Sequence, residues 1–374
     1  MARIAIDIPH FYLRCKINMD NCNFFLRSYS KFVFRRFEMK YFLTTLLVFS
    51  FIYEAKSNEI NRVVKPDFMS QTEFEAIFSD ISNWGRWGDA DQLGTLNLIT
   101  DKKRVEASKL VITGQTVSLS LPLNETKDAI NESPFVHEPF IFPAAFGIPK
   151  EALPEAAGDN FSVAYHGFAH SHVDAISHFG YKGKMYNGYS FELSEGGFEK
   201  LGIENIAESG IITRGVLIDF PKFFGVDYLE PGRIITTEDI LNWEKKNGIT
   251  IGSGDALLIK TGRWKAVQKK GQWNFVESAA GMHASVAEFL KERDVAIIGC
   301  DGVSDVMPSG VENRFNPLHE LVIVSLGMPI FDNLDLRAVS ATANRLNRST
   351  FMLVASPLMV EGATGSPLNP MAIF

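Results

Sequence analysis

Four of the eight histidines fall within 13 residues, at His166, His170, His172 and His178, and Asp174 stands among them. Imidazole and carboxylate groups together are the usual protein ligands of zinc, manganese and iron. A lone histidine is most often a hydrogen-bonded core or surface residue, but this density would require several partnered imidazoles in one place. The segment therefore predicts a metal or catalytic site.

The spacing of His172 and Asp174 indicates how they could share an ion. In an extended strand, residues two apart face the same way with Cα atoms roughly 6–7 Å apart, so both side chains reach one cation. His170 has the same parity, but a straight strand from 170 to 174 covers roughly 13 Å, so three-point chelation needs a bend or a bulge. A helix would instead place 170, 174 and 178 on one face. A nearby glycine and a β-branched valine disfavour that helix, so we expect a strand that breaks before His178 and leaves His178 free as an acid or base.

The stretch from Phe168 to His178 (FAHSHVDAISH) resembles the H-x-G-T-H-x-D-x-P-x-H signature of the cyclase family, which includes bacterial-type kynurenine formamidases and isatin hydrolases. Other segments are similar to later or earlier family segments: Asp89–Asn97, Gly254–Gly262, Gly299–Asp301, Pro317–His319 and Gly365–Pro370. Their combined order covers nearly the whole chain after residue 57. It is far more specific than any single segment.

The resemblance implies a role for each matching residue. His172 and Asp174 correspond to metal ligands, and His178 to the general acid/base. His319 and Asp332 correspond to a histidine and a carboxylate of a second metal position, although the formamidase pattern has glutamate there and a spacing shorter by one residue. The implied cofactor is a divalent ion, zinc or manganese, with one or two ions per chain. Such an ion activates water and polarises an amide carbonyl.

Phe168 departs from the signature because it occupies the place of the first histidine ligand. His170 replaces the glycine of the signature, and Ile176 replaces its proline. His170 or His166 could supply the missing ligand, and we include His170 among the predicted ligands. Phe168 and Trp87 are predicted to form part of an aromatic wall for an aryl substrate, with ordinary core packing as the alternative.

The function that the resemblance implies is that of a metal-dependent amidohydrolase. The leading hypothesis is an arylformamidase that converts N-formyl-kynurenine to kynurenine and formate in tryptophan catabolism. The alternatives are hydrolysis of a cyclic amide or lactone, and a catalytically impaired binding protein that keeps the fold. The sequence holds no G-x-S-x-G, P-loop or H-E-x-x-H motif, so other hydrolase classes lack their usual evidence. The expected partner is a small-molecule substrate, and the family resemblance implies a homo-oligomer.

The first 57 residues differ from the rest of the chain. They hold nine Lys/Arg against four Asp/Glu, whereas the whole chain has a net charge of -7, which favours no nucleic-acid partner. Met39-Lys40 precedes the apolar run Tyr41–Tyr53, which is too short to span a bilayer as a helix. We interpret residues 39–57 as a signal peptide and residues 1–38 as an upstream extension, with a targeting segment or membrane anchor as the alternative. The expected location is the secretory lumen or the exterior, with no membrane attachment after cleavage.

Residues 58–374 are predicted to form one α/β domain, a mixed β-sheet with flanking helices. The resemblance implies the swivelling β/β/α type of the cyclase family. Residues 124–160, rich in Pro, Glu, Asn and Gly, are expected to form a long loop over the site. Cys300 is expected to be a buried thiol. Expected strands are 117–121, 215–220, 256–260 and 295–299; expected helices are 72–84, 237–246 and 285–293; and the runs 321–326 and 351–355 continue the mixture.

Overall fold

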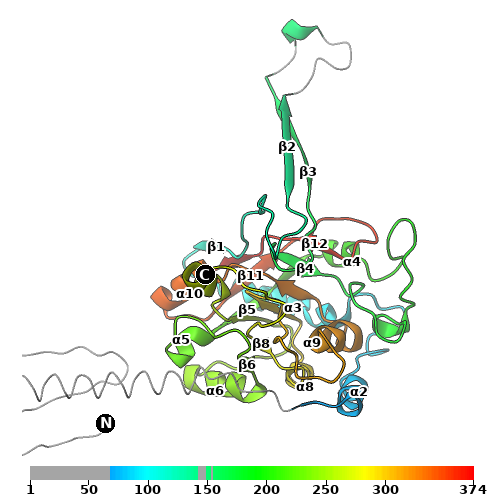
Figure 1. The fold of residues 1–374 in the computed structure, drawn as a ribbon, viewed down its shortest axis with the longest axis vertical. Helices are drawn as coiled ribbons and strands as arrows, with labels where there is room; N and C mark the ends of the chain where they lie inside the picture. The colour runs from blue at the N-terminus through cyan, green and yellow to red at the C-terminus, as the bar shows by residue number, and fades with distance from the viewer. Residues whose placement is uncertain (1–67, 142–148, 153–154) are drawn as a thin grey trace, which may run out of the picture. The chain divides into compact units, whose positions relative to one another are not determined.

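The apolar runs assemble into one mixed sheet, at the centre of the ribbon in Figure 1. The computed structural model describes residues 68–141, 149–152 and 155–374. These residues belong to one compact unit of the chain. The predicted signal peptide and the upstream extension lie outside the described residues.

The large sheet has nine strands in the order β1-β13-β11-β5-β7-β9-β10-β4-β12. Its four central strands β5, β7, β9 and β10 run parallel, and the strands on both sides are antiparallel. The strands are β1 (Thr116–Ser118), β4 (His172–Asp174), β5 (Ile211–Asp219), β7 (Ala256–Lys260), β9 (Ile297–Cys300), β10 (Ile330–Asp332), β11 (Thr350–Ala355), β12 (Gly365–Pro367) and β13 (Met371–Ile373). Two short strands, β6 (Ile234–Ile235) and β8 (Gly281–Met282), pair separately. The predicted mixed α/β fold is therefore confirmed.

Successive residues of the central strands face opposite sides of the sheet, as strand geometry requires. Leu257 and Ile259 of β7 belong to one hydrophobic core, and Ala256 and Leu258 belong to a second core on the other face. Both faces are buried, which is why these strands read as continuous apolar runs.

Helices cover both faces of the sheet. They are α2 (Gln71–Asp80), α3 (Asp101–Ser108), α4 (Ile203–Ala207), α5 (Phe220–Phe224), α6 (Thr237–Asn247), α7 (Arg263–Lys270), α8 (Val286–Glu292), α9 (Pro317–His319) and α10 (Arg337–Leu346). Short turns of helix are the 3₁₀ turns η1 (Gly94–Leu98), η2 (Lys150–Ala152) and η3 (Tyr186–Gly188) and the π-helical turn η4 (Glu320–Leu326). Helix α6 matches the prediction and begins with a capping box between Thr236 and Asp239. Among the described residues, none of the helices has both the length and the apolar character needed to cross a bilayer.

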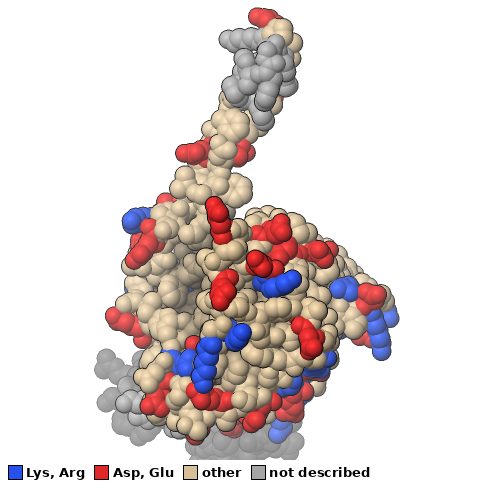
Figure 2. All heavy atoms as spheres, turned by 90° about the vertical axis from the view of Figure 1, so that its right-hand side faces the viewer, with Lys and Arg blue, Asp and Glu red and all other residues tan. Residues whose placement is uncertain are grey.

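Residues 124–135 are largely irregular, as expected for a loop, but the described residues after them depart from that expectation. A hairpin of β2 (Val136–Ile141) and β3 (Ala157–Ser162) projects from the body of the molecule in Figures 1 and 2. Nearly all its residues are exposed, so it lacks the alternation of buried and exposed side chains by which strands are recognised. On the face shown in Figure 2, Lys and Arg are interspersed with Asp and Glu rather than gathered in one basic patch.

Candidate metal centre

Strand β4 brings His172 and Asp174 to one face of the sheet. Their side chains are buried, and His172 Nε2 lies 3.3 Å from Asp174 Oδ1. Val173 between them points into the core on the opposite face. In the neighbouring strand β10, Asp332 stands directly opposite His172 in the register, so its side chain emerges on the same face. The predicted strand and its parity are therefore confirmed at this position.

Two further histidines approach Asp174 from the loops on either side of β4. His166 Nδ1 lies 3.0 Å from Asp174 Oδ1, and His178 Nε2 lies 3.8 Å from the same oxygen. The chain turns directly after β4, where the His178 amide donates to the Ala175 carbonyl. The His166 and His178 rings stack with their centroids 3.8 Å apart. The strand ends before His178, as expected from the sequence.

His319 reaches the cluster from the opposite side, at the end of α9. Its Nε2 lies 3.6 Å from Asp174 Oδ2 and 3.3 Å from Asp332 Oδ2. Its Nδ1 donates a 2.5 Å hydrogen bond to Asp305, which is buried and also accepts the backbone N–H of Leu318. Asp332 in turn accepts a 3.0 Å hydrogen bond from the Ser304 hydroxyl. Asp305 and Ser304 were not predicted from the sequence.

One arrangement is shared by three of these histidines, His166, His172 and His319. An outer group holds one ring nitrogen, and the other ring nitrogen faces Asp174. His166 Nε2 lies 2.9 Å from the Thr364 hydroxyl, and His172 Nδ1 donates to the His170 carbonyl at 2.8 Å. Metal-bound histidines are held in this way in proteins, because the outer partner fixes the tautomer and the ring direction. His178 differs, because no hydrogen bond from a described residue holds its other ring nitrogen.

The donor set fits a cation. Asp174 Oδ1 and His166 Nδ1 are buried and only 3.0 Å apart, yet they do not have the geometry of a hydrogen bond. Ligand atoms of His166, Asp174 and His178 lie within 4.8 Å of one another, as do those of His172, Asp174 and Asp332. Converging nitrogen and carboxylate donors are the ligands of zinc and manganese. Because Asp174 belongs to both groups, these residues would suit one ion or two ions.

The charged groups of the cluster change the pKa values of one another. Burial alone would raise the pKa of Asp174, but the charges of His178 and His172 outweigh burial and hold the pKa well below its usual value. Burial and the neighbouring histidines lower the pKa of His178 to about 4, although Asp174 opposes that change. His178 is therefore a neutral imidazole at neutral pH, in the form that accepts a proton.

His170 does not join the cluster. Its two ring nitrogens lie 3.3 Å from the Ala164 carbonyl and 3.4 Å from the Asn124 carbonyl. The residue that stands beside Asp174 is His166, the other candidate for the missing ligand. His170 has the parity of His172 and Asp174 in the sequence, but the strand begins only at His172, so that parity does not place the His170 side chain on the same face.

The two predicted substrate-binding residues have different surroundings. The Phe168 ring packs 5.5 Å from the Phe275 ring, in a small hydrophobic cluster that also includes Trp273 and Met307. The ring contact of Trp87 is with the Arg86 guanidinium, 4.7 Å from the ring centroid, and does not link Trp87 to the metal centre.

Another aromatic residue lies directly against the cluster. The centroid of the Phe179 ring is 5.0 Å from that of His178 and 5.1 Å from that of His319. Its position directly after His178 is the signal in the sequence that could have indicated this contact.

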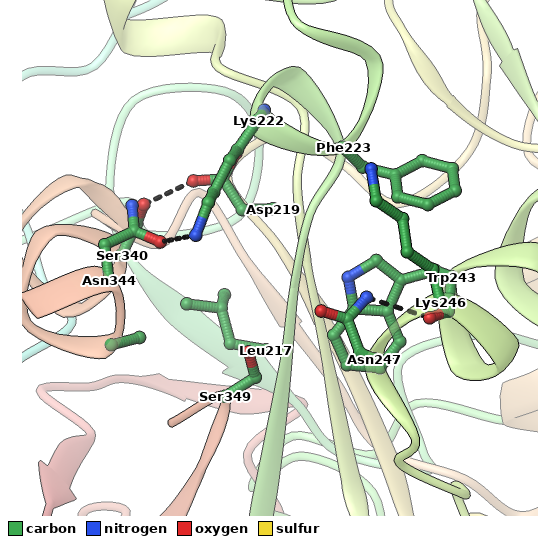
Figure 3. A pocket seen from close by; sticks show the side chains of 11 residues that line it. Leu217, Asp219, Lys222, Phe223, Trp243, Lys246, Asn247, Ser340, Asn344 and Ser349 are labelled. Atoms are coloured by element: carbon green, nitrogen blue, oxygen red, sulfur yellow. Dashed lines mark hydrogen bonds between the residues drawn. The ribbon is translucent and has the colours of Figure 1, made fainter. Parts of the chain in front are cut away.

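Figure 3 shows a pocket whose lining includes none of the predicted site residues. Several of its polar side chains form hydrogen bonds within the pocket: Ser340 donates to Asp219, Lys222 to Asn344, and Asn247 to the backbone carbonyl of Trp243. The pocket therefore offers satisfied polar groups rather than a second reactive cluster.

Comparisons with known proteins agree with this architecture. A family model described as putative cyclase matches residues 117–305, just over half of the chain. The chain belongs to the cyclase family. No curated protein sequence matches it.

Solved structures show the same fold. A structure described as a novel cyclase is 29% identical, covers 79% of this chain and 99% of its own, and has a TM-score of 0.69. Isatin hydrolase A from Ralstonia solanacearum is 21% identical, covers 69% of this chain and 91% of its own, and has a TM-score of 0.50. The predicted family and fold are thus confirmed.

Replacing Asp305 with asparagine is expected to weaken binding of zinc or manganese about 10–100-fold, the usual effect of removing an outer carboxylate from a metal-bound histidine. The amide cannot accept the Nδ1–H of His319 and the Leu318 N–H as a carboxylate does. Titration of the metal-free protein measures the change.

The matched control is Asp301→Asn. Asp301 is equally buried, but it binds Thr261 and the Gly262 N–H instead of a histidine. If both variants bound metal equally well, Asp305 would have no specific part in holding His319.

Proposed function

We propose that the protein is a metal-dependent amidohydrolase, and that its substrate is an aryl formamide such as N-formyl-kynurenine. The observation that carries this proposal is the buried Asp174 carboxylate, which meets His166, His172 and His178 at one oxygen and His319 at the other. Membership of the cyclase family supports metal-dependent hydrolysis as the general class.

The proposed ligands are His166, His172, Asp174, His319 and Asp332, holding zinc or manganese. When bound, such an ion makes water a better nucleophile and polarises the amide carbonyl. The remaining steps belong to the residues of the chain. In formamide hydrolysis, a C–O bond to water forms, the C–N bond breaks, and one proton passes from water to the leaving nitrogen.

His178 suits the transfer of that proton. It is neutral at neutral pH, lies beside Asp174 and keeps a quarter of its side chain exposed, so it can take a proton from water and then deliver it to the nitrogen. The ring of Phe179, between His178 and His319, provides an apolar surface for an aryl group next to these atoms. The partly buried Phe168 ring offers a second such surface.

The structural likeness to isatin hydrolase A motivates a second candidate, hydrolysis of a cyclic aryl amide such as isatin. The same proton transfer would accompany cleavage of the C–N bond in the ring. Cleavage opens the ring, and the leaving nitrogen stays attached to the product. The same aromatic surface serves both substrates, so the assay must include both.

Removal of the metal is expected to abolish the activity. The purified protein would be assayed with N-formyl-kynurenine and with isatin, before and after treatment with a chelator, and again after addition of zinc or manganese. Loss with the chelator and recovery with metal support the proposal. Turnover that is indifferent to chelation would contradict the metal mechanism, and stoichiometric metal without turnover of either amide would contradict the substrate.

Secretion and self-association stay predictions from the sequence.

A further inference from the structure

Arg263, at the start of α7, is a buried cation close to the metal centre that the proposed reaction does not use. Its side chain is 3% exposed, and burial lowers its pKa to about 10, so it is charged at neutral pH. No carboxylate of the described residues lies within ion-pair distance of it. Its guanidinium carbon lies 4.3 Å from the Trp264 ring and 4.0 Å from the Phe275 ring. A buried cation without a carboxylate partner is energetically unfavourable. The Arg263 guanidinium therefore depends on its hydrogen bonds for stabilisation.

Those hydrogen bonds lead to the loop before β4. One guanidinium nitrogen of Arg263 donates to the Phe168 carbonyl at 2.6 Å, and the other donates to the Asn333 side-chain oxygen at 2.5 Å. The Asn333 amide nitrogen donates to the Gly167 carbonyl at 2.7 Å and to the His170 carbonyl at 3.2 Å. Three carbonyls of the loop are thus gathered by one arginine and one asparagine.

The position of Asn333 ties this network to the metal centre. Asn333 is fully buried, directly follows Asp332 and has a φ of 54°, a left-handed conformation that asparagine tolerates well. The His170 carbonyl that it binds also accepts the Nδ1–H of His172. The Asn333 side-chain amide therefore helps to fix the loop. Through the shared His170 carbonyl, it also helps to set the tautomer of His172.

The path of the loop explains how His166 reaches Asp174. Gly167 has a φ of 114°, which a residue with a side chain rarely adopts, and the chain turns there. With the carbonyls of 167, 168 and 170 held inward, the Phe168 ring packs on Phe275 and the His166 ring lies against Asp174.

We propose that Arg263 and Asn333 are positioning residues that hold the 166–170 loop. In the family signature the first histidine ligand stands at position 168. Here the loop places His166 so that it serves as this ligand instead. The proposal rests on the proposed metal function. Neither residue needs to touch the ion or the substrate.

The experiment measures metal affinity of the purified protein by titration with zinc, and ligand geometry by the absorption spectrum of the cobalt-substituted protein. Arg263→Lys keeps the charge but cannot reach both acceptors. It is expected to weaken zinc binding about 10–100-fold and to alter the cobalt spectrum. Asn333→Asp keeps the size and the left-handed conformation but loses both amide donors, so it is expected to act in the same direction.

A double-mutant cycle with His166→Ala tests whether the effect passes through His166. If Arg263 acts by placing His166, Arg263→Lys should change zinc affinity less than about threefold once His166 is absent. An equal effect with and without His166 would overturn the proposal.

The matched control is Arg233→Lys. Arg233 is also buried and binds the Ile234 carbonyl and Asp239, but it makes no contact with the loop. If Arg233→Lys lost as much zinc affinity as Arg263→Lys, the effect would be a general destabilisation and the proposal would be overturned. Unchanged zinc affinity in both Arg263→Lys and Asn333→Asp would also overturn the proposal. Failure of the unaltered protein to bind zinc or manganese would instead contradict the proposed function itself.

Discussion

Replacing His166 with alanine is expected to weaken zinc or manganese binding by more than about 100-fold, beyond the roughly 10–100-fold effect of removing an outer partner. His166 Nδ1 lies 3.0 Å from Asp174 Oδ1, and its Nε2 is held by Thr364, so the ring is already directed towards Asp174. Truncation removes a nitrogen donor that no neighbouring side chain replaces.

His170→Ala is the matched comparison, because both residues are histidines of the same loop and both were candidates for the missing ligand. The His170 ring lies against backbone carbonyls, so its loss is expected to change metal affinity by less than about threefold while reducing stability. Titration of the metal-free proteins measures affinity, and thermal unfolding measures stability separately. A larger loss of metal in His170→Ala than in His166→Ala would reverse the assignment.

Local patterns were sufficient to predict the centre of the site. The alternation of His172, Val173 and Asp174 predicts two side chains on one face of a strand, and β4 has that form because strand geometry depends only on neighbouring residues. The long apolar runs at 215–220 and 256–260 likewise predict buried strands, since a strand covered on both faces needs apolar residues at every position.

Other parts depend on contacts between distant residues and could not be predicted from local patterns. The run 321–326 contains three β-branched residues, which favour a strand, but it forms the buried π-helical turn η4. Asp305 holds a histidine 14 residues later, and Arg263 binds a carbonyl 95 residues earlier. The position of His166 beside Asp174 depends on the turn at Gly167, which no local pattern indicates.

The last prediction concerns His178, whose ring could serve either as a ligand or as the group that moves the proton. His178→Ala is expected to lower kcat for the amide substrate about 10²–10⁴-fold, the usual contribution of a general acid or base. Metal affinity is expected to change less than about threefold. The reason is that His178 Nε2 lies 3.8 Å from Asp174 Oδ1, farther from this oxygen than the ring nitrogens of His166 and His172. Steady-state kinetics and metal titration of the same preparation measure the two quantities.

Two comparisons sharpen the test of His178. His137→Ala is the control, because His137 is an exposed histidine of the β2–β3 hairpin that pairs with Asp159, and it is expected to leave both quantities unchanged. Added imidazole should restore part of the kcat of His178→Ala, since the site is partly open to solvent at that side chain. Loss of the metal together with kcat would make His178 a ligand of the ion, and the proton transfer would then require another group. Loss of kcat with the metal still bound, reversed by imidazole, is the combination that only a proton carrier produces.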